Sequence, residues 1–356
     1  MEASVLYKEH TPKELVSQTS IKTNSFQIQE LLQHLQIQFQ NSNATATNKT
    51  EDCPSDVTAF MVFFSHWVKH RFDNITVRGA ENINPNRNHI FISNHRDILL
   101  DPVLVNHALI SQNHSAARCI IGSNLTEDPS MAALMKLAGC LEVPRGNLPL
   151  KQKFVTLKRL SQHIQHSLPH HNVWIAQREG RAKEGFDQTN PAVLKMLTMA
   201  KEKGQSQTEF LTQQSIIPVA ISYQWDPSDT HKALETYLKG LSGSEYSTAT
   251  RTDTMEHLID SLDRCQGEVE IRFGTPLVAS DNIDDVAQHI DDHVHNHYKL
   301  FDSHHAAHHI INKTVIPEHL TAAAKQLKAR ASQLPAAAQR KLIQSYANSY
   351  QQVHVR

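Results

Sequence analysis

The spacing of hydrophobic positions changes character at Asn74. Before this residue, apolar side chains recur every three or four positions over 26–39 and over 57–72, and this spacing predicts two amphipathic helices. A polar stretch rich in Asn and Thr over 41–52 separates them and predicts an exposed loop. After Asn74, short β-branched runs alternate with longer helical patterns, which indicates an α/β fold.

The alternating region predicts a mixed central sheet that is flanked by helices, with helical extensions at the N- and C-terminal ends. Strands are expected at Ile75–Arg78, His89–Ser93, Arg118–Gly122, Cys140–Val143, Val173–Ala176, Ile216–Ser222 and Glu268–Phe273. Helices are expected at about 101–112, 127–137, 150–168, 190–203, 228–241, 251–264 and 283–300, with two more after Pro317 and Pro335.

The composition excludes several classes of protein. The 35 Lys and Arg residues nearly cancel the 36 Asp and Glu residues, so a basic chain that binds nucleic acid is excluded, and no nucleic-acid partner is expected. The four cysteines form no C-x-x-C pair, which argues against a zinc ribbon and favours a reducing compartment. Only 11 glycines argue against a turn-dense all-β fold.

No segment of the sequence is expected to act as a signal peptide or to span a membrane. The first ten residues contain no apolar core of a signal peptide. The most apolar run, 57–72, includes His66, Lys69 and Arg71 and falls short of the roughly 20 apolar residues that a span needs. We therefore expect a cytoplasmic protein, soluble or peripheral at the inner face of the membrane.

A histidine follows the second predicted strand directly. The strand ends at Ser93, so Asn94 and His95 occupy the carboxyl end of a strand, where open α/β sheets bind their ligands. A carboxylate a few residues along can hold a histidine in one tautomer and leave its other ring nitrogen free as a general base. Asp97 and Asp101 are both candidates for that carboxylate.

Three later segments also combine a strand with chemically active side chains. One closes on an arginine, the next ends in a Glu-Gly turn among cations, and the last has a proline within a strand. They are Gly139-Cys-Leu-Glu-Val-Pro-Arg145, Trp174-Ile-Ala-Gln-Arg178-Glu179-Gly180-Arg181-Ala-Lys183 and Ile216-Ile-Pro-Val-Ala220.

In order, the four segments resemble the four motifs of the glycerolipid acyltransferase superfamily, which includes glycerol-3-phosphate and lysophosphatidate acyltransferases. His95 stands in a segment similar to Asn-His-x4-Asp, and Arg145 ends one similar to Gly-x-x-Phe-x-x-Arg. Glu179 stands in a segment similar to Phe-x-Glu-Gly-x-Arg, and the proline strand is similar to Val/Ile-Pro-Val. The motifs span about 90–222, and the full resemblance covers about 57–300.

The first motif departs from the family pattern in its spacing. The family aspartate lies five residues after the histidine, whereas Asp101 lies six after His95 and Asp97 lies two after it. We favour Asp101 because Pro102 follows it, a pairing that the family often shows at this aspartate.

The second and third motifs depart as well. Arg181 lies two residues after Glu179 instead of three, Gln177-Arg178 replaces the usual Phe-Pro, and Glu142 stands where an aromatic residue is common. These changes indicate a divergent branch and bear on the acceptor more than on the reaction class.

The resemblance implies a role for each motif residue. His95 would be the general base that removes the acceptor proton, oriented by Asp101 or Asp97. Glu179 and Gly180 would shape the turn near the acceptor. No metal and no resident cofactor are implied. The cations would hold the acceptor phosphate, since a guanidinium makes paired bonds to phosphate oxygens: Arg145, Arg178, and Arg181 or Lys183, with Arg96 at the acceptor or at the donor phosphates.

The resemblance also implies the reaction and the domain boundaries. A fatty acyl group would move from acyl-CoA or acyl carrier protein to a hydroxyl of glycerol 3-phosphate or lysophosphatidate, in phospholipid biosynthesis. The acyltransferase domain would cover 56–300, after an N-terminal helical segment and polar loop over 1–55 and before a basic helical extension over 301–356. Two alternatives are an acyltransferase for a non-phosphorylated or unusual acceptor and a non-catalytic protein that binds lipid or metal.

Two further features concern partners. Eight of the 24 histidines lie within 289–309, yet they lack an ordered ligand spacing, so they indicate a histidine-rich solvated helix more than a metal site. From Lys313 onward, seven basic residues accompany one acid. This basic extension predicts a helix that packs on its own domain or on a partner helix, with contact to anionic lipid as the alternative.

Overall fold

In the computed structural model, the described residues are 61, 64–127, 132, 135, 138–143, 148–241, 260–278 and 280–354. The predicted N-terminal segment 1–55 lies outside this part of the chain. The helices predicted over 127–137 and 251–264 lie largely outside it as well.

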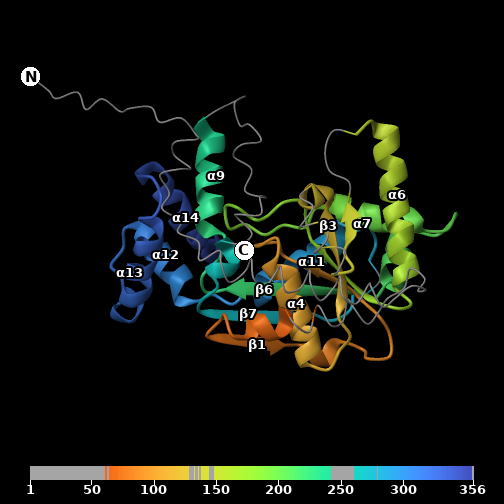
Figure 1. The fold of residues 1–356 in the computed structure, drawn as a ribbon, viewed down its shortest axis with the longest axis horizontal. Helices are drawn as coiled ribbons and strands as arrows, with labels where there is room; N and C mark the ends of the chain where they lie inside the picture. Colours follow the sequence, from red (N-terminus) through yellow and green to blue (C-terminus); the bar gives the residue numbers. More distant parts are fainter. Residues whose placement is uncertain are drawn as a thin grey trace, which may run out of the picture.

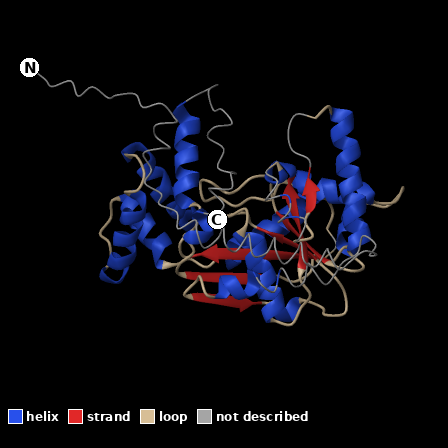
Figure 2. Cartoon of the chain, in the orientation of Figure 1, coloured by secondary structure: helices blue, strands red, loops and turns tan. Residues whose placement is uncertain are grey.

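A seven-stranded sheet runs through the molecule in the order β1-β7-β6-β2-β5-β3-β4 (Figure 2). β6 and β7 are antiparallel, whereas the other neighbouring pairs are parallel, so the prediction of a mixed sheet is confirmed. The strands are β1 (Asn74–Arg78), β2 (Ile90–Ser93), β3 (Ala117–Gly122), β4 (Leu141–Val143), β5 (Asn172–Ala176), β6 (Ile216–Tyr223) and β7 (Glu268–Phe273).

The central strand β2 is buried on both faces. Phe91 packs into the hydrophobic core on one side of the sheet, and Ile90 and Ile92 pack into the core on the other side. A strand that is covered on both faces has a continuous apolar sequence instead of an alternating one. Because Ser93 pairs with Ala176 of β5, the segments that follow these two strands emerge side by side.

Helices cover both faces of this sheet, as predicted. Figure 1 shows α4 in front of the sheet and α11 behind it, and the two helices contribute to different cores. A third core joins α9 to the C-terminal helices. The helices are α4 (Leu100–Ser111), α6 (Leu150–Ser167), α7 (Pro191–Leu197), α8 (Gln207–Gln213), α9 (Asp229–Leu241), α11 (Ile283–His297), α12 (Asp302–Asn312), α13 (Thr321–Ala331) and α14 (Ala336–His354), with short 3₁₀ turns at Ala80–Asn82, Ser123–Thr126, Thr198–Ala200 and Glu318–Leu320.

The hydrophobic pattern does not predict two of these helices. α8 has only two buried side chains, Phe210 and Leu211, so its periodicity is weak. Its start is nevertheless marked, because the Ser206 side chain accepts a hydrogen bond from the Glu209 backbone at 3.1 Å. α12 buries only Ser303, His304, Ala306 and Ala307, and its other histidines are half-buried, so it has no clear apolar face in the sequence.

His304 is a fully buried histidine where α12 meets α14. Its ring stacks against Phe301, lies 5.5 Å from the Tyr346 ring, and accepts the Phe301 backbone N–H at Nδ1 over 3.1 Å. Burial, together with the positive charge of Arg96, lowers the pKa of His304 from the ordinary 6.5 to about 3. The ring is therefore neutral in the folded protein and becomes charged on unfolding in mild acid.

We expect this histidine to make the protein less stable as the pH falls. Its folded pKa lies below its unfolded pKa, so the stabilisation is complete above pH 6.5 and is lost progressively toward pH 3. Between pH 7 and pH 5 the free energy of unfolding should fall by about 2 kcal/mol on account of this residue. Urea unfolding of the wild type and of His304→Gln at both pH values measures the effect. Equal pH dependence of the two proteins would contradict it.

No helix in the described part of the chain combines the length and the hydropathy needed to cross a bilayer.

Candidate active site

The loop after β2 is fixed to the neighbouring strand by Asn94. The side chain of this buried residue donates to the Ile221 carbonyl at 2.9 Å and accepts from the Ile221 N–H at 2.8 Å. On the other side, Trp174 of β5 donates to the Ser93 hydroxyl at 3.1 Å. The chain therefore leaves the sheet in a defined direction, which places the next residue, His95.

His95 and Asp101 form a hydrogen-bonded pair. His95 Nδ1 lies 3.0 Å from Asp101 Oδ2, and the carboxylate is fully buried in the first turn of α4. If Nδ1 carries the proton that this bond needs, Nε2 is left with its lone pair. The Trp174 ring lies edge-on at 6.4 Å from the imidazole and limits its movement.

Three further donors hold the Asp101 carboxylate. Oδ2 accepts the backbone N–H groups of Arg96 and Asp97 at 2.7 and 2.9 Å, and Oδ1 accepts the Tyr223 hydroxyl at 2.8 Å. Burial, with the charges of Asp101 and Asp97, raises the pKa of Tyr223 well above its ordinary value, so its hydroxyl remains a donor. A carboxylate with four partners has little freedom to rotate away from His95.

The carboxylate of Asp97 does not contact His95 but caps the start of α4. Oδ1 accepts the N–H groups of Leu99 and Leu100 at 2.9 Å each, which satisfies two donors that a helix start leaves unpaired. Oδ2 accepts the Ser228 hydroxyl. Of the two carboxylates left open by the sequence, Asp101 is the one that reaches the ring of His95.

His95 lines a cavity of about 430 Å³ at the carboxyl ends of the strands. One part of its wall is apolar and includes Ile98, Leu157 and Met196. Another part is polar and comes from the segment after β5. A volume of this size is typical of small-molecule sites. The other lining residues are Ile120, Ile121, Gly122, Leu125, Val143, Lys153, Trp174, Ile175, Ala176, Arg178, Glu179, Gly180, Arg181, Lys183, Asn190, Ala192 and Val193.

The Glu179-Gly180 turn lines the same cavity as His95. Gly180 has a φ of 78°, in the left-handed region where glycine is favoured, so the chain reverses here at little cost. Arg178, which precedes the turn, and Lys153 of α6 also line the cavity. The structure therefore brings the first and third motifs to one site, because each follows one of two paired strands, β2 and β5.

Two of the predicted phosphate ligands are paired with an acid that the motifs do not include. Glu235 of α9 forms a short ion pair with Lys183 and lies 3.9 Å from the Arg181 guanidinium. Burial lowers the pKa of Lys183, while Glu235 acts in the opposite direction. Arg145, the ligand predicted from the second motif, lies outside the described residues.

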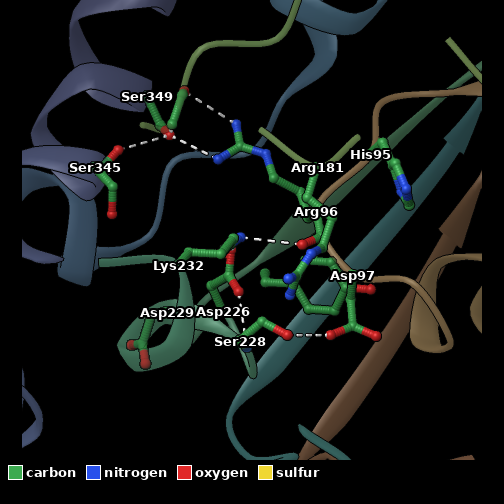
Figure 3. A network of polar contacts seen from close by, with 12 residues as sticks. His95, Arg96, Asp97, Arg181, Asp226, Ser228, Asp229, Lys232, Ser345 and Ser349 are labelled. Atoms are coloured by element: carbon green, nitrogen blue, oxygen red, sulfur yellow. Dashed lines mark hydrogen bonds and ion pairs between the residues drawn. The ribbon is translucent and has the colours of Figure 1, made fainter. Parts of the chain in front are cut away.

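Arg96 lies away from the cavity, contrary to the prediction that it contacts the acceptor or the donor. Its buried guanidinium forms an ion pair with Asp187, donates to Ser349 of α14 at 3.1 Å, and stacks 4.9 Å from the Tyr298 ring. Figure 3 shows the Arg96 guanidinium directed toward Ser349, away from His95. The side chain of Arg96 thus joins the loop that carries His95 to α14, the last helix of the described chain.

The backbone of Arg96 has a partner of its own. Lys232 of α9 donates to the Arg96 carbonyl at 3.0 Å and forms an ion pair with Asp226, whose pKa is raised by burial (Figure 3). Reasoning from motifs missed Lys232, Glu235, Asp187 and Tyr223, since none stands in a motif position. Only Tyr223 had a signal in the sequence, because it ends the strand that carries the fourth motif.

The clustered histidines use their ring nitrogens for hydrogen bonds. His293 bonds the Arg272 carbonyl, His295 the Asp187 carbonyl, and His297 the carbonyl of His293. Among the described residues, no group of three or more His, Cys, Asp or Glu side chains converges as metal ligands would.

Comparison with known proteins identifies a family match for the part of the chain that contains this site. The family model described as Acyltransferase matches residues 74–222, a range that includes His95, Asp101 and all the residues that line the cavity. It confirms the resemblance that the motifs indicate. A similar solved structure is the 1-acyl-sn-glycerophosphate (LPA) acyltransferase PlsC from Thermotoga maritima, 12% identical over 80% of this chain and 95% of that one, with a TM-score of 0.43. No curated protein matches the chain.

Proposed function

We propose that this chain, which matches the Acyltransferase family model over residues 74–222, is a glycerolipid acyltransferase that moves a fatty acyl group from a thioester to an acceptor hydroxyl. The thioester would be acyl-CoA or acyl carrier protein, and the acceptor glycerol 3-phosphate or lysophosphatidate. The observation that carries the proposal is the pair of His95 with a buried, fully hydrogen-bonded Asp101 at a cavity of about 430 Å³.

The proposed reaction uses His95 first as a base and then as an acid. Nε2 takes the proton of the acceptor hydroxyl while the acceptor oxygen attacks the carbonyl carbon of the thioester, and a tetrahedral oxyanion forms. Collapse of that intermediate breaks the carbon–sulfur bond, and the thiolate leaves with the proton from the imidazolium. Asp101 stabilises the charged ring in between, as the carboxylate does in a catalytic triad, and no acyl-enzyme forms.

The cavity walls match the two ends of such a substrate pair. Apolar side chains on one wall would hold the acyl chain by removing its surface from water. Arg178 and Lys153 supply positive charge on the lining for an acceptor phosphate. Turnover of a labelled acyl-CoA with glycerol 3-phosphate and with lysophosphatidate tests the proposal, and absence of both products would overturn it.

Replacement of Arg178 by alanine should raise KM for the phosphorylated acceptor at least tenfold, with a smaller change in kcat. A hydrogen bond to a charged group contributes about 1.5–3 kcal/mol, which corresponds to this change or more. Initial rates at varied acceptor concentration give both constants. Lys195→Ala, which removes an exposed cation of α7 outside the cavity lining, is the matched control. An unchanged KM in Arg178→Ala would contradict phosphate binding by this residue.

One observation favours a second acceptor class. Glu235 engages Lys183 and Arg181, so two cations of the third motif are already paired in the absence of an acceptor phosphate. A non-phosphorylated alcohol would need no free cation here. The same assay with a monoacylglycerol separates the two acceptors: faster turnover of that alcohol than of lysophosphatidate would favour the second.

A further inference from the structure

The first half of α6 projects from the domain. Residues 150–159 are all exposed or half-buried, whereas the buried positions of this helix, such as Leu160 and Ile164, begin after them. Figure 1 shows α6 at the edge of the molecule. Three large apolar side chains on this half are exposed to solvent: Leu150 is 85% exposed, Phe154 57% and Val155 40%.

The exposed half is also strongly basic. α6 contains four Lys and Arg residues and no acid. Because residues four apart share a helix face, they form two neighbouring rows. One row is Leu150, Phe154 and Lys158, and the other is Lys151, Val155 and Arg159. We call these six residues the α6 docking face.

The docking face borders the cavity of His95. Lys153 and Leu157, on the adjoining side of the same helix, line that cavity. A molecule that moves between the cavity and a surface bound to the docking face would therefore pass beside α6.

We propose that the α6 docking face binds a lipid surface with anionic headgroups. Apolar side chains on an interfacial helix enter the boundary between headgroups and acyl chains, while flanking cations remain at the headgroup phosphates. The mixture of apolar and basic side chains on one projecting helix matches such a surface, and the absence of acids on α6 favours negative charge in the partner. The purpose of this contact between the docking face and the bilayer rests on the proposed function, because a lipid acceptor or product would have to pass between the bilayer and the cavity.

Cosedimentation with vesicles of phosphatidylglycerol and phosphatidylcholine at equal amounts tests the proposal. The full chain should bind these vesicles and release them as salt is raised, because exposed charges are screened. Leu150→Ser/Phe154→Ser and Lys151→Gln/Lys158→Gln should each weaken binding about tenfold or more. The matched control is Val278→Ser/Val315→Ser, since these valines are 66% and 89% exposed and lie far along the chain from α6. The control should bind as the wild type does.

Several results would overturn the proposal. They are wild-type protein that does not bind the vesicles, an α6 variant that binds undiminished, and a loss in the control as large as that in the α6 variants. Circular dichroism establishes that the variants fold. If the α6 variants lost binding to an acidic carrier protein or self-association while vesicle binding stayed intact, the face would belong to a protein partner. His95→Ala should bind vesicles normally, so absent turnover with intact binding would remove the proposed function alone.

Discussion

Replacement of His95 by alanine is expected to lower the rate of acyl transfer by at least 10²-fold. A positioned general base typically accelerates a reaction by about 10²–10⁴-fold, and this acceleration is lost with the base. The acceptor hydroxyl is a weak nucleophile until its proton is taken, and His95 is a histidine at the cavity whose ring is oriented by the buried carboxylate of Asp101. Single-turnover measurements with a labelled thioester test the chemical step apart from substrate binding. A residual rate within tenfold of the wild type would contradict the role of His95.

The two aspartates provide the control for this prediction. Asp101→Asn should lower the rate by about 10²-fold, because an amide cannot stabilise the imidazolium and its NH2 group can turn toward Nδ1. Asp97→Asn should retain most of the rate, because Asp97 contacts the start of α4 and Ser228 instead of the His95 ring. Its main effect should be on stability, about 1–2 kcal/mol, since one helix-cap or buried hydrogen bond is weakened. Equal loss of rate in both variants would contradict the pairing of His95 with Asp101.

The second large effect is expected from the ion pair of Arg96 with Asp187, behind the loop that carries His95. Arg96→Met should lower the free energy of unfolding by about 3–5 kcal/mol, because it leaves the buried Asp187 carboxylate without its cation. No other donor in the described part of the chain can readily replace the guanidinium, since Oδ1 of Asp187 is already buried without a hydrogen-bond partner. Denaturant unfolding measures the change.

A double variant separates this electrostatic cost from a loss of packing. Arg96→Met/Asp187→Asn removes both charges and should recover at least half of the lost stability. The recovered protein should still turn over more slowly than the wild type, because the bond from Arg96 to Ser349 is absent and the loop that holds His95 is less constrained. If the double variant were as unstable as the single variant, the ion pair would not be the cause.

The sequence was sufficient for the parts of the fold that local patterns encode. β2 could be predicted because both its faces are buried, which leaves a continuous apolar run before Asn94 and His95. All seven strands lie where the hydrophobic runs predict them, within a few residues. α12 could not be predicted, because its buried side chains are small apart from one histidine, His304, and three more histidines lie on its remaining surface.

The site was predictable at the strand ends and less so around them. His95 and the Glu179-Gly180 turn each follow a predicted strand, and they meet because the structure pairs those two strands, β2 and β5, in parallel. The sequence favoured Asp101 over Asp97 because Pro102 follows it, and in the structure Asp101 is the aspartate that contacts the His95 ring. Glu235 and Asp187 belong to no motif and reach their cations only through tertiary packing.

The bond from Arg96 to Ser349 links residues 253 positions apart in the chain. Contacts so distant in sequence form late, because a long loop must close before they contribute any stability. During synthesis, all four motifs therefore leave the ribosome before the helix that holds the catalytic loop exists. The proposed active site is therefore complete only after α14 has emerged. Until then, the growing chain contains the motif residues, but the loop that carries His95 is not yet held in place.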